Sequence, residues 1–203
     1  MIGSPNGISL SLLQQPQTVF KVADIAMITG VTDAVSIVQR MAYAIKKGLF
    51  VSPRKGIYAK PGYSAAELAG CLYTPSYLSM EYILQQEGVV FQYSSEITVI
   101  SYLNRTVEVD GKTFVYRKVK DSILANTLGI QIGMISKATK ERAFLDMLYL
   151  NANCHFDNPS ILNKEEVSRL LSVYNSPTLT KRALKIMNQR TPINWQIVEK
   201  RMM

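Results

Sequence analysis

His155, Cys71 and Cys154 carry the side chains best suited to nucleophilic or metal chemistry in this 203-residue chain. Cys154 and His155 are adjacent, whereas a catalytic base must approach the sulfur of a nucleophile from a separate element. A zinc site needs three or four Cys or His ligands at short spacings, and the sequence offers no such cluster. The segment "SPRKG" lacks the glycine pattern of a nucleotide-phosphate loop. We therefore expect no catalytic residue, no bound metal and no cofactor.

Asp110, Gly111 and Lys112 resemble half of a metal-dependent nuclease site, in which a carboxylate and a lysine act together. The same residues lie between two β-like runs, "TVEV" and "TFVYRKV", and Asp-Gly is typical of a two-residue hairpin turn. No closely spaced pair of aspartates marks a two-metal centre. We predict a turn here, and a nuclease built around Asp110 is the alternative function.

The net charge of +8 is concentrated at the two ends of the chain. Residues 1–62 carry seven Lys and Arg against two Asp, and residues 181–203 carry six against one Glu. Residues 63–180 hold ten basic and twelve acidic residues. Basic segments attract polyanions, so the ends are the candidate nucleic-acid surfaces. The C-terminal basic segment carries Lys181, Arg182, Lys185 and Arg190. It is either a second DNA surface or a solvated face.

Two helices joined by a short turn are predicted over residues 22–48. Apolar residues recur at helical spacing in "KVADIAMITG", and Gly30 is typical of a helix end. A second helix follows, with Thr32 as its cap. A short strand, "TVF", precedes the pair, and two strand-like runs, "LFV" and "GIYA", follow it. This order predicts a winged helix-turn-helix domain over residues 1–62.

The second of these helices is the candidate for DNA recognition. Its inward face is predicted to consist of Val35, Val38, Met41 and Ile45. On the opposite side Gln and Arg can contact adenine and guanine edges, while Ser and Lys suit phosphates, and the wing tip adds two cations. The predicted DNA-binding residues are Thr32, Asp33, Ser36, Gln39, Arg40, Tyr43, Lys47, Arg54 and Lys55. A solvated face on a protein-docking module is the alternative interpretation.

Residues 63–203 are predicted to form a larger α/β domain in which an antiparallel sheet is flanked by helices. Helices are expected in "SAAELAGCLY" and in "TPSYLSMEYILQQEG", the latter with Thr74 as cap and Pro75 at its first position. Strands follow in "VVFQY", "ITVISYL", "TVEV", "TFVYRKV" and "GIQIGMI". Helices resume in "ATKERAFLDMLYLNA", "NKEEVSRLLSVYN", "TLTKRALKIMNQR" and "NWQIVEKRMM". The expected fold class is therefore α+β.

Composition favours a cytoplasmic protein. Hydrophobic residues make up 47% of the chain, but no run approaches the roughly 18 uncharged apolar residues of a membrane span. The N-terminus "MIGSPNGISL" lacks the basic start and apolar stretch of a signal peptide. Two cysteines are too few for a disulfide framework, so both are expected as buried thiols in a reducing compartment.

Four blocks, in this order, carry a family resemblance: "VFKVADIAMITGVT", "KKGLFVSPRKGIYA", "PSYLSMEYILQQEGVV" and "KATKERAFLDMLYL". Together they cover residues 19–150 and resemble the AbiEi family of type IV antitoxins and related bacterial transcriptional regulators. The resemblance implies a winged-helix domain that binds repeats in the promoter of its own operon. It also implies a C-terminal domain that counters a nucleotidyltransferase-like toxin encoded beside it, with or without direct contact. A stand-alone winged-helix regulator is the alternative.

Two positions depart from the pattern of that family. Lys21 stands where Ser or Thr commonly caps the helix that follows, which would weaken the cap by about 1 kcal/mol. The order of charges in Lys140-Glu141-Arg142 also differs, and we expect this difference to affect only the surface. Within the resemblance, Arg54 and Lys55 match the basic wing, and the two blocks of the second domain are expected to be buried helices without a catalytic role.

Overall fold

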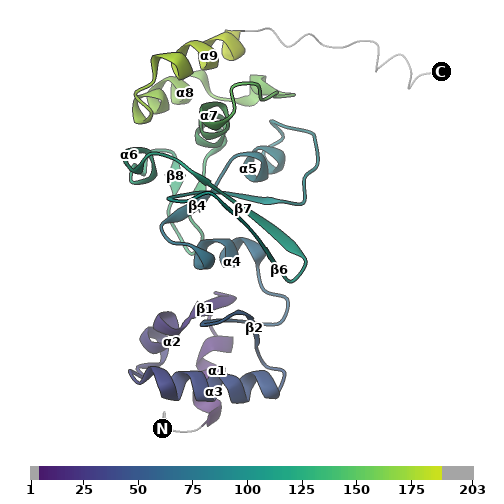
Figure 1. Ribbon diagram of the computed structural model, residues 1–203, viewed down its shortest axis with the longest axis vertical. Helices are drawn as coiled ribbons and strands as arrows, with labels where there is room; N and C mark the ends of the chain where they lie inside the picture. The colour runs from purple at the N-terminus through teal and green to yellow at the C-terminus, as the bar shows by residue number, and fades with distance from the viewer. Residues whose placement is uncertain (1–4, 189–203) are drawn as a thin grey trace, which may run out of the picture.

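The computed structural model describes residues 5–188, which form two bodies stacked along the long axis of the molecule (Figure 1). The expected helix "NWQIVEKRMM" and Arg190 lie outside these residues. The first body consists of α1 (Pro5–Leu13), β1 (Val19–Lys21), α2 (Val22–Thr29), α3 (Ala34–Lys46), β2 (Val51–Arg54) and β3 (Ile57–Ala59). The elements from β1 to β3 correspond to those that the sequence predicted over residues 18–59.

The turn between α2 and α3 is set by the residues on either side of it. Gly30, with φ of 71°, adopts the left-handed conformation that favours glycine, and its N–H donates to the carbonyl oxygen of Ala26, which ends α2. After the turn the chain has changed direction by 98°. The two helices then pack together through Ile25, Ile37 and Met41, all fully buried.

The central strand of the small sheet, β3, is buried on both faces. The sheet is antiparallel with the order β1-β3-β2, and successive strand residues point to opposite sides. Tyr58 packs into the cluster of the first body, whereas Ile57 and Ala59 belong to the core of the second body. The predicted boundary at residue 62 therefore does not separate the two hydrophobic cores, because residues before it pack into the core of the second body.

Polar contacts join the two bodies at the same place. The buried carboxylate of Glu67 accepts the backbone N–H groups of Thr18 and Val19, at 2.6 and 3.0 Å. The Thr18 hydroxyl in turn accepts the N–H of Ser64, at 2.9 Å. The bonds to Glu67 satisfy backbone donors at the start of β1, and the bond to Thr18 satisfies the backbone donor of Ser64.

The second body is a six-stranded sheet with helices around it. The order is β6-β7-β5-β4-β9-β8, and the pairs β5–β7 and β4–β9 are parallel, so the expected antiparallel sheet is in fact mixed. Its elements are α4 (Ala65–Leu72), β4 (Ser76–Leu78), α5 (Glu81–Gln86), β5 (Ile97–Ser101), β6 (Arg105–Val109), β7 (Lys112–Lys118), α6 (Asp121–Leu124), β8 (Ile130–Gln131), β9 (Lys137–Ala138), α7 (Lys140–Leu150), α8 (Lys164–Leu170) and α9 (Pro177–Asn188), with 3₁₀ turns at Pro159–Ile161 and Leu171–Val173.

Strand β4 replaces the first half of an expected helix. The prediction of a helix capped by Thr74 was wrong, because Tyr77 and Leu78 pair with β5 and are almost fully buried there. Pairing in the centre of a sheet outweighs the local helical signal. The expected strand "VVFQY" is also absent from the described structure, since Phe91 and Tyr93 are exposed and the segment pairs with no strand.

The three helices α7, α8 and α9 agree with the sequence expectation, whereas α6 was not predicted. Helices α7, α8 and α9 coincide with three of the predicted segments, and Thr139 and Asn163 cap the first two of them through their side chains. Within residues 5–188, no single helix is long and apolar enough to cross a membrane. Helices α2 and α3 together reach the length and apolar composition of a membrane span, but a bend of 98° separates them.

A buried ion pair lies at the centre of the second body. Arg142 and Asp146, one turn apart on α7, are 3.4 Å apart and have no exposed side-chain surface. The expectation that Arg142 would affect only the surface was wrong. Burial raises the pKa of the Asp146 carboxyl, and the charge of Arg142 opposes that effect.

The remaining hydrogen-bonding capacity of this pair is also used. Asp146 accepts the hydroxyls of Tyr77, Ser79 and Tyr174, at 3.2, 2.7 and 2.6 Å. Arg142 donates to the Tyr77 hydroxyl, at 3.0 Å, and to the backbone oxygens of Ile123, Asn126 and Leu128. The network thus joins α7 to β4, to α6 with the loop after it, and to the residue following the second 3₁₀ turn.

Replacing Asp146 with Ala should destabilise the protein by about 3–5 kcal/mol, because Arg142 then stays buried without a counter-charge. Urea denaturation followed by circular dichroism measures this change. Arg169→Ala is the matched control, since it breaks an exposed ion pair with Glu166 and should leave the urea midpoint unchanged. Equal midpoints for the two variants would contradict a stabilising role for the buried pair.

Candidate functional site

The exposed side of α3 holds three of the nine residues predicted to contact DNA, namely Gln39, Tyr43 and Lys47. Gln39 and Lys47 are exposed, and Tyr43 is 47% exposed with the Lys47 Nζ 5.6 Å from the centre of its ring. Thr32 is exposed in the turn before the helix. These side chains lie on one surface, as the helical spacing predicted.

The orientation of α3 about its axis differs from the prediction. Val35 and Val38, expected to face inward, are 64% and 45% exposed, whereas Ile37 and Ala44 are buried beside Met41. The error arises because residues 35, 38, 41 and 45 and residues 37, 41 and 44 both follow helical spacing. Choosing between two such overlapping stripes requires the packing partners, here the buried rings of Phe20 and Phe50 in the same cluster.

Asp33 is the N-cap of α3, immediately before the first helical residue. Its carboxylate accepts the backbone N–H groups of Val35 and Ser36, at 3.2 and 2.9 Å. The prediction that Thr32 caps this helix was therefore wrong by one residue. Asp33 was also predicted to contact DNA, and in the structure its carboxylate caps the first turn of α3.

Arg40 lies along the flank of α3 rather than on its exposed side. The residue is half-buried, and its buried Nη1 has no hydrogen-bond partner among the described residues. Ser36 is half-buried on the same flank. The most exposed face of α3 is centred on Val35, Gln39, Ala42 and Lys46. The face predicted to contact DNA is rotated from it about the helix axis, towards Ser36 and Arg40.

The hairpin of β2 and β3 carries two exposed cations with different surroundings. Lys55 is exposed in the turn. Arg54 donates to the Tyr73 hydroxyl of the second body, at 3.3 Å, and its guanidinium lies 5.4 Å from the centre of that ring. Arg105 of β6 lies 5.9 Å from the same ring. Arg54 thus contacts the second body instead of extending alone from the tip.

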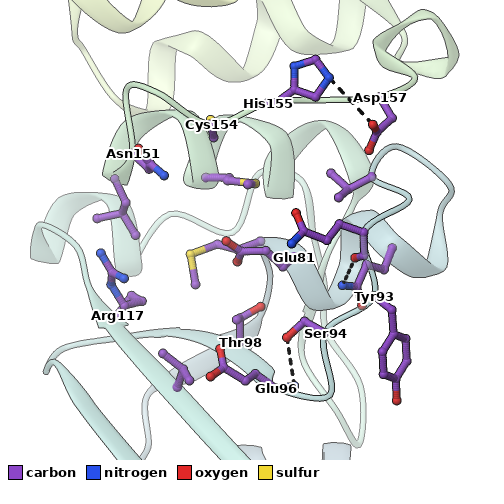
Figure 2. A pocket seen from close by; sticks show the side chains of 17 residues that line it. Glu81, Tyr93, Ser94, Glu96, Thr98, Arg117, Asn151, Cys154, His155 and Asp157 are labelled. Carbon is purple, nitrogen blue, oxygen red and sulfur yellow. Dashed lines mark hydrogen bonds and ion pairs between the residues drawn. The ribbon is translucent and has the colours of Figure 1, made fainter.

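A polar cavity of about 720 Å³ opens in the second body, and nothing in the sequence patterns indicated it (Figure 2). Asn151, Cys154 and His155 lie on the side formed by the end of α7 and the chain after it, opposite Thr98 and Arg117 of the sheet. These residues are up to 57 positions apart in sequence, so no local motif joins them. Three carboxylates also line the cavity, those of Glu81, Glu96 and Asp157.

The cavity does not provide an activated nucleophile. Burial raises the pKa of the Cys154 thiol to about 11, so the thiol is protonated at neutral pH. The His155 ring is 86% exposed and lies 3.8 Å from Asp157. Cys71 and Cys154 are half-buried rather than fully buried as predicted. No group of three or more His, Cys, Asp or Glu residues suited to a metal ion occurs within residues 5–188.

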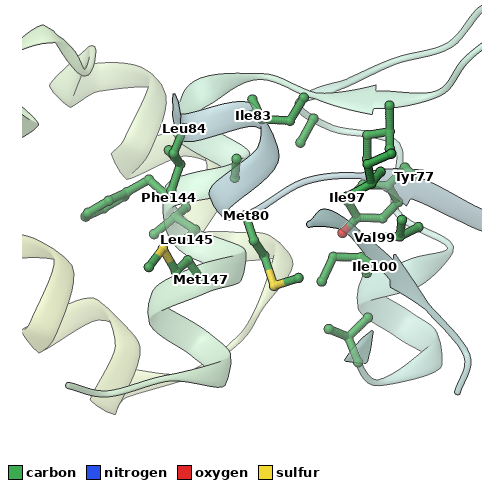
Figure 3. Packing of buried hydrophobic residues seen from close by; sticks show 14 of the residues in the cluster. Tyr77, Met80, Ile83, Leu84, Ile97, Val99, Ile100, Phe144, Leu145 and Met147 are labelled. Carbon is green, nitrogen blue, oxygen red and sulfur yellow. The ribbon is translucent and has the colours of Figure 1, made fainter. Parts of the chain in front are cut away.

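Beside the cavity, α7 and α5 pack against the sheet through apolar side chains (Figure 3). Phe144, Leu145 and Met147 of α7 meet Met80, next to α5, and Ile83 of α5 in one buried cluster. Most residues of the helical block "KERAFLDMLYL" are therefore buried, as predicted.

Asp110 forms the hairpin turn that its sequence predicted. Asp110 and Gly111 have φ values of 50° and 70°, and Val109 pairs with Lys112. The Asp110 carboxylate accepts the Tyr63 hydroxyl, at 2.7 Å, and the Lys112 Nζ lies 5.2 Å from the Tyr63 ring. These contacts fix the hairpin to the segment that connects the two bodies.

Comparison of the sequence with known proteins found no relative. The sequence matches no protein-family model, and no curated protein matches it. The resemblance to AbiEi antitoxins stays a prediction from the four sequence blocks.

Replacing Asp33 with Ala should destabilise the protein by about 1 kcal/mol, because two N–H groups of the first turn of α3 lose their acceptor. Asp33→Asn keeps an acceptor and should retain most of the stability. Thr32→Ala is the matched control and should have no effect on the thermal midpoint. A larger loss in Thr32→Ala than in Asp33→Ala would contradict the assignment of the cap.

Proposed function

We propose that the first body is a winged helix-turn-helix domain that binds double-stranded DNA, and that the protein represses transcription of its own operon. The observation that carries this proposal is the order α1-β1-α2-α3-β2-β3 with a change of direction of 98° between α2 and α3. A short glycine-containing turn and an angle of about 90–120° are typical of helix-turn-helix motifs. Helix α3 would enter the major groove.

The distribution of charge supports the same proposal. Lys46, Lys47 and Lys55 are exposed, and α3 contains no acidic residue. The two acidic residues of the first body bind backbone N–H groups, Asp24 that of Lys21 and Asp33 those of its own helix. Cations near the ends of a groove-binding helix suit the phosphates on either side of the groove.

We propose further that the second body makes the protein an antitoxin against a nucleotidyltransferase-like toxin. The resemblance to AbiEi antitoxins supports this part. Two of its four blocks contain the buried network, since Tyr77 and Ser79 lie in one and Arg142 and Asp146 in the other. Two of the four blocks that carry the resemblance therefore supply the charged pair and two of its hydroxyl partners.

DNA binding is tested with the full chain and a duplex from the region upstream of its gene, by fluorescence anisotropy over a range of salt. Lys46→Ala, Lys47→Ala and Lys55→Ala should each weaken binding and reduce the slope of log K against log salt by about 1. Lys55→Ala is a cleaner wing variant than Arg54→Ala, because Arg54 also contacts Tyr73. Lys164→Ala, an exposed cation on α8, is the control.

Wild-type slopes and affinities in all three variants would contradict this use of the first body. Binding that survives them but is lost in Lys181→Ala with Lys185→Ala would place the DNA surface on α9 instead.

The antitoxin proposal predicts that the adjacent gene encodes a nucleotidyltransferase-like protein whose expression arrests growth. Co-expression of this chain should restore growth, measured as colony counts. The variant that combines Lys46→Ala, Lys47→Ala and Lys55→Ala should restore growth equally well, because those residues lie outside the second body. Continued arrest with the wild-type chain would contradict the antitoxin function and leave a transcriptional regulator.

A further inference from the structure

The exposed face of α3 is apolar at its centre. Val35 is 64% exposed and Val38 is 45% exposed, and Ala42 is exposed one turn further along. Residues three, four and seven positions apart lie on the same side of a helix, so these three side chains form a strip. Gln39 is the polar residue within it, and Lys46 lies at its end.

The packing of the first body does not account for this strip. Ile37, Met41 and Ala44 already fill the inward side of α3. β-Branched residues lower helix propensity slightly, and exposed valines gain nothing from burial. Val35 and Val38 therefore gain burial only through a ligand that meets this face.

Charge identifies the occupant of this face as a polyanion with apolar groups. The strip ends at Lys46 and Lys47, and α3 carries no acidic side chain. In the major groove, the 5-methyl group of thymine is the apolar feature, and it lies between two phosphate backbones. A groove rich in thymine thus matches both the apolar centre and the cationic end of the strip.

The available polar side chains favour the same base pair. Gln contacts adenine through N6 and N7, whereas guanine is usually read by Arg or Lys at O6 and N7. The arginine of α3, Arg40, lies half-buried on the flank with its Nη1 buried. Lys46 and Lys47 are confined to the last turn and the C-cap of the helix.

We propose that α3 reads A·T base pairs, with Val35 and Val38 against thymine methyl groups and Gln39 on an adjacent adenine. This inference rests on the proposed DNA-binding function and specifies its target. Val35, Val38 and Gln39 are then residues that determine sequence specificity, while the lysines supply affinity that does not depend on sequence.

The test begins with selection of binding sites by the full chain from a duplex library with a randomised core. The selected duplex is then prepared with thymine or with uracil, which lacks only the 5-methyl group. The wild-type protein should bind the uracil duplex about fourfold more weakly for each methyl group that is buried. In Val35→Ala this ratio should fall by about fourfold, while the salt dependence stays that of the wild type.

Ile132→Ala removes an exposed apolar side chain from the second body and is the matched control, with the wild-type ratio expected. Equal affinity for both duplexes, or selection of G·C-rich sites, would overturn the inference and leave the DNA-binding function standing. Absence of binding to any duplex at low salt would overturn both. A change of oligomeric state in Val35→Ala, with an unchanged ratio, would overturn the inference by showing that the strip contacts protein.

Discussion

The burial of β3 on both faces constrains the whole molecule. Tyr58 belongs to the buried cluster of the first body, together with residues of α2 and α3. Its two sequence neighbours, Ile57 and Ala59, belong to the core of the second body, together with residues of α4. Neither body can shift along the small sheet without exposing one of these faces to water. The Glu67 carboxylate bonds to the start of the neighbouring strand at the same junction. The exposed face of α3 is therefore held in a fixed direction relative to the second body.

The second body depends in turn on the pair of Arg142 and Asp146. Removing two charges from water is costly, and this cost is offset only when the donors and acceptors around the pair are satisfied. Here three hydroxyls and three backbone oxygens perform that task, from elements far apart in the chain. Folding of the second body thus specifies one arrangement of β4, α6 and α7. The proposed antitoxin surface would be carried by this framework.

Local signals in the sequence predicted the features that depend on a few neighbouring residues. Gly30 ended α2, and Asp110-Gly111 formed a hairpin turn, because left-handed backbone favours those residue types. Features that depend on distant partners were missed. The pairing of β4 overrode a helical pattern, and the burial of Arg142 follows from hydroxyls and carbonyls up to 65 positions away. Likewise, Val35 faced outward because Phe20 and Phe50 pack with the alternative stripe of α3.

Hydrogen–deuterium exchange of the full chain, with and without a duplex from its upstream region, tests the central claim most directly. The claim is that DNA meets α3 and the turn between β2 and β3. Deuterium uptake should fall in peptides spanning residues 31–56 when the duplex is present. Uptake around the cavity, in residues 89–96 and 151–157, should stay unchanged. Protection confined to those cavity segments, with none in residues 31–56, would contradict the account.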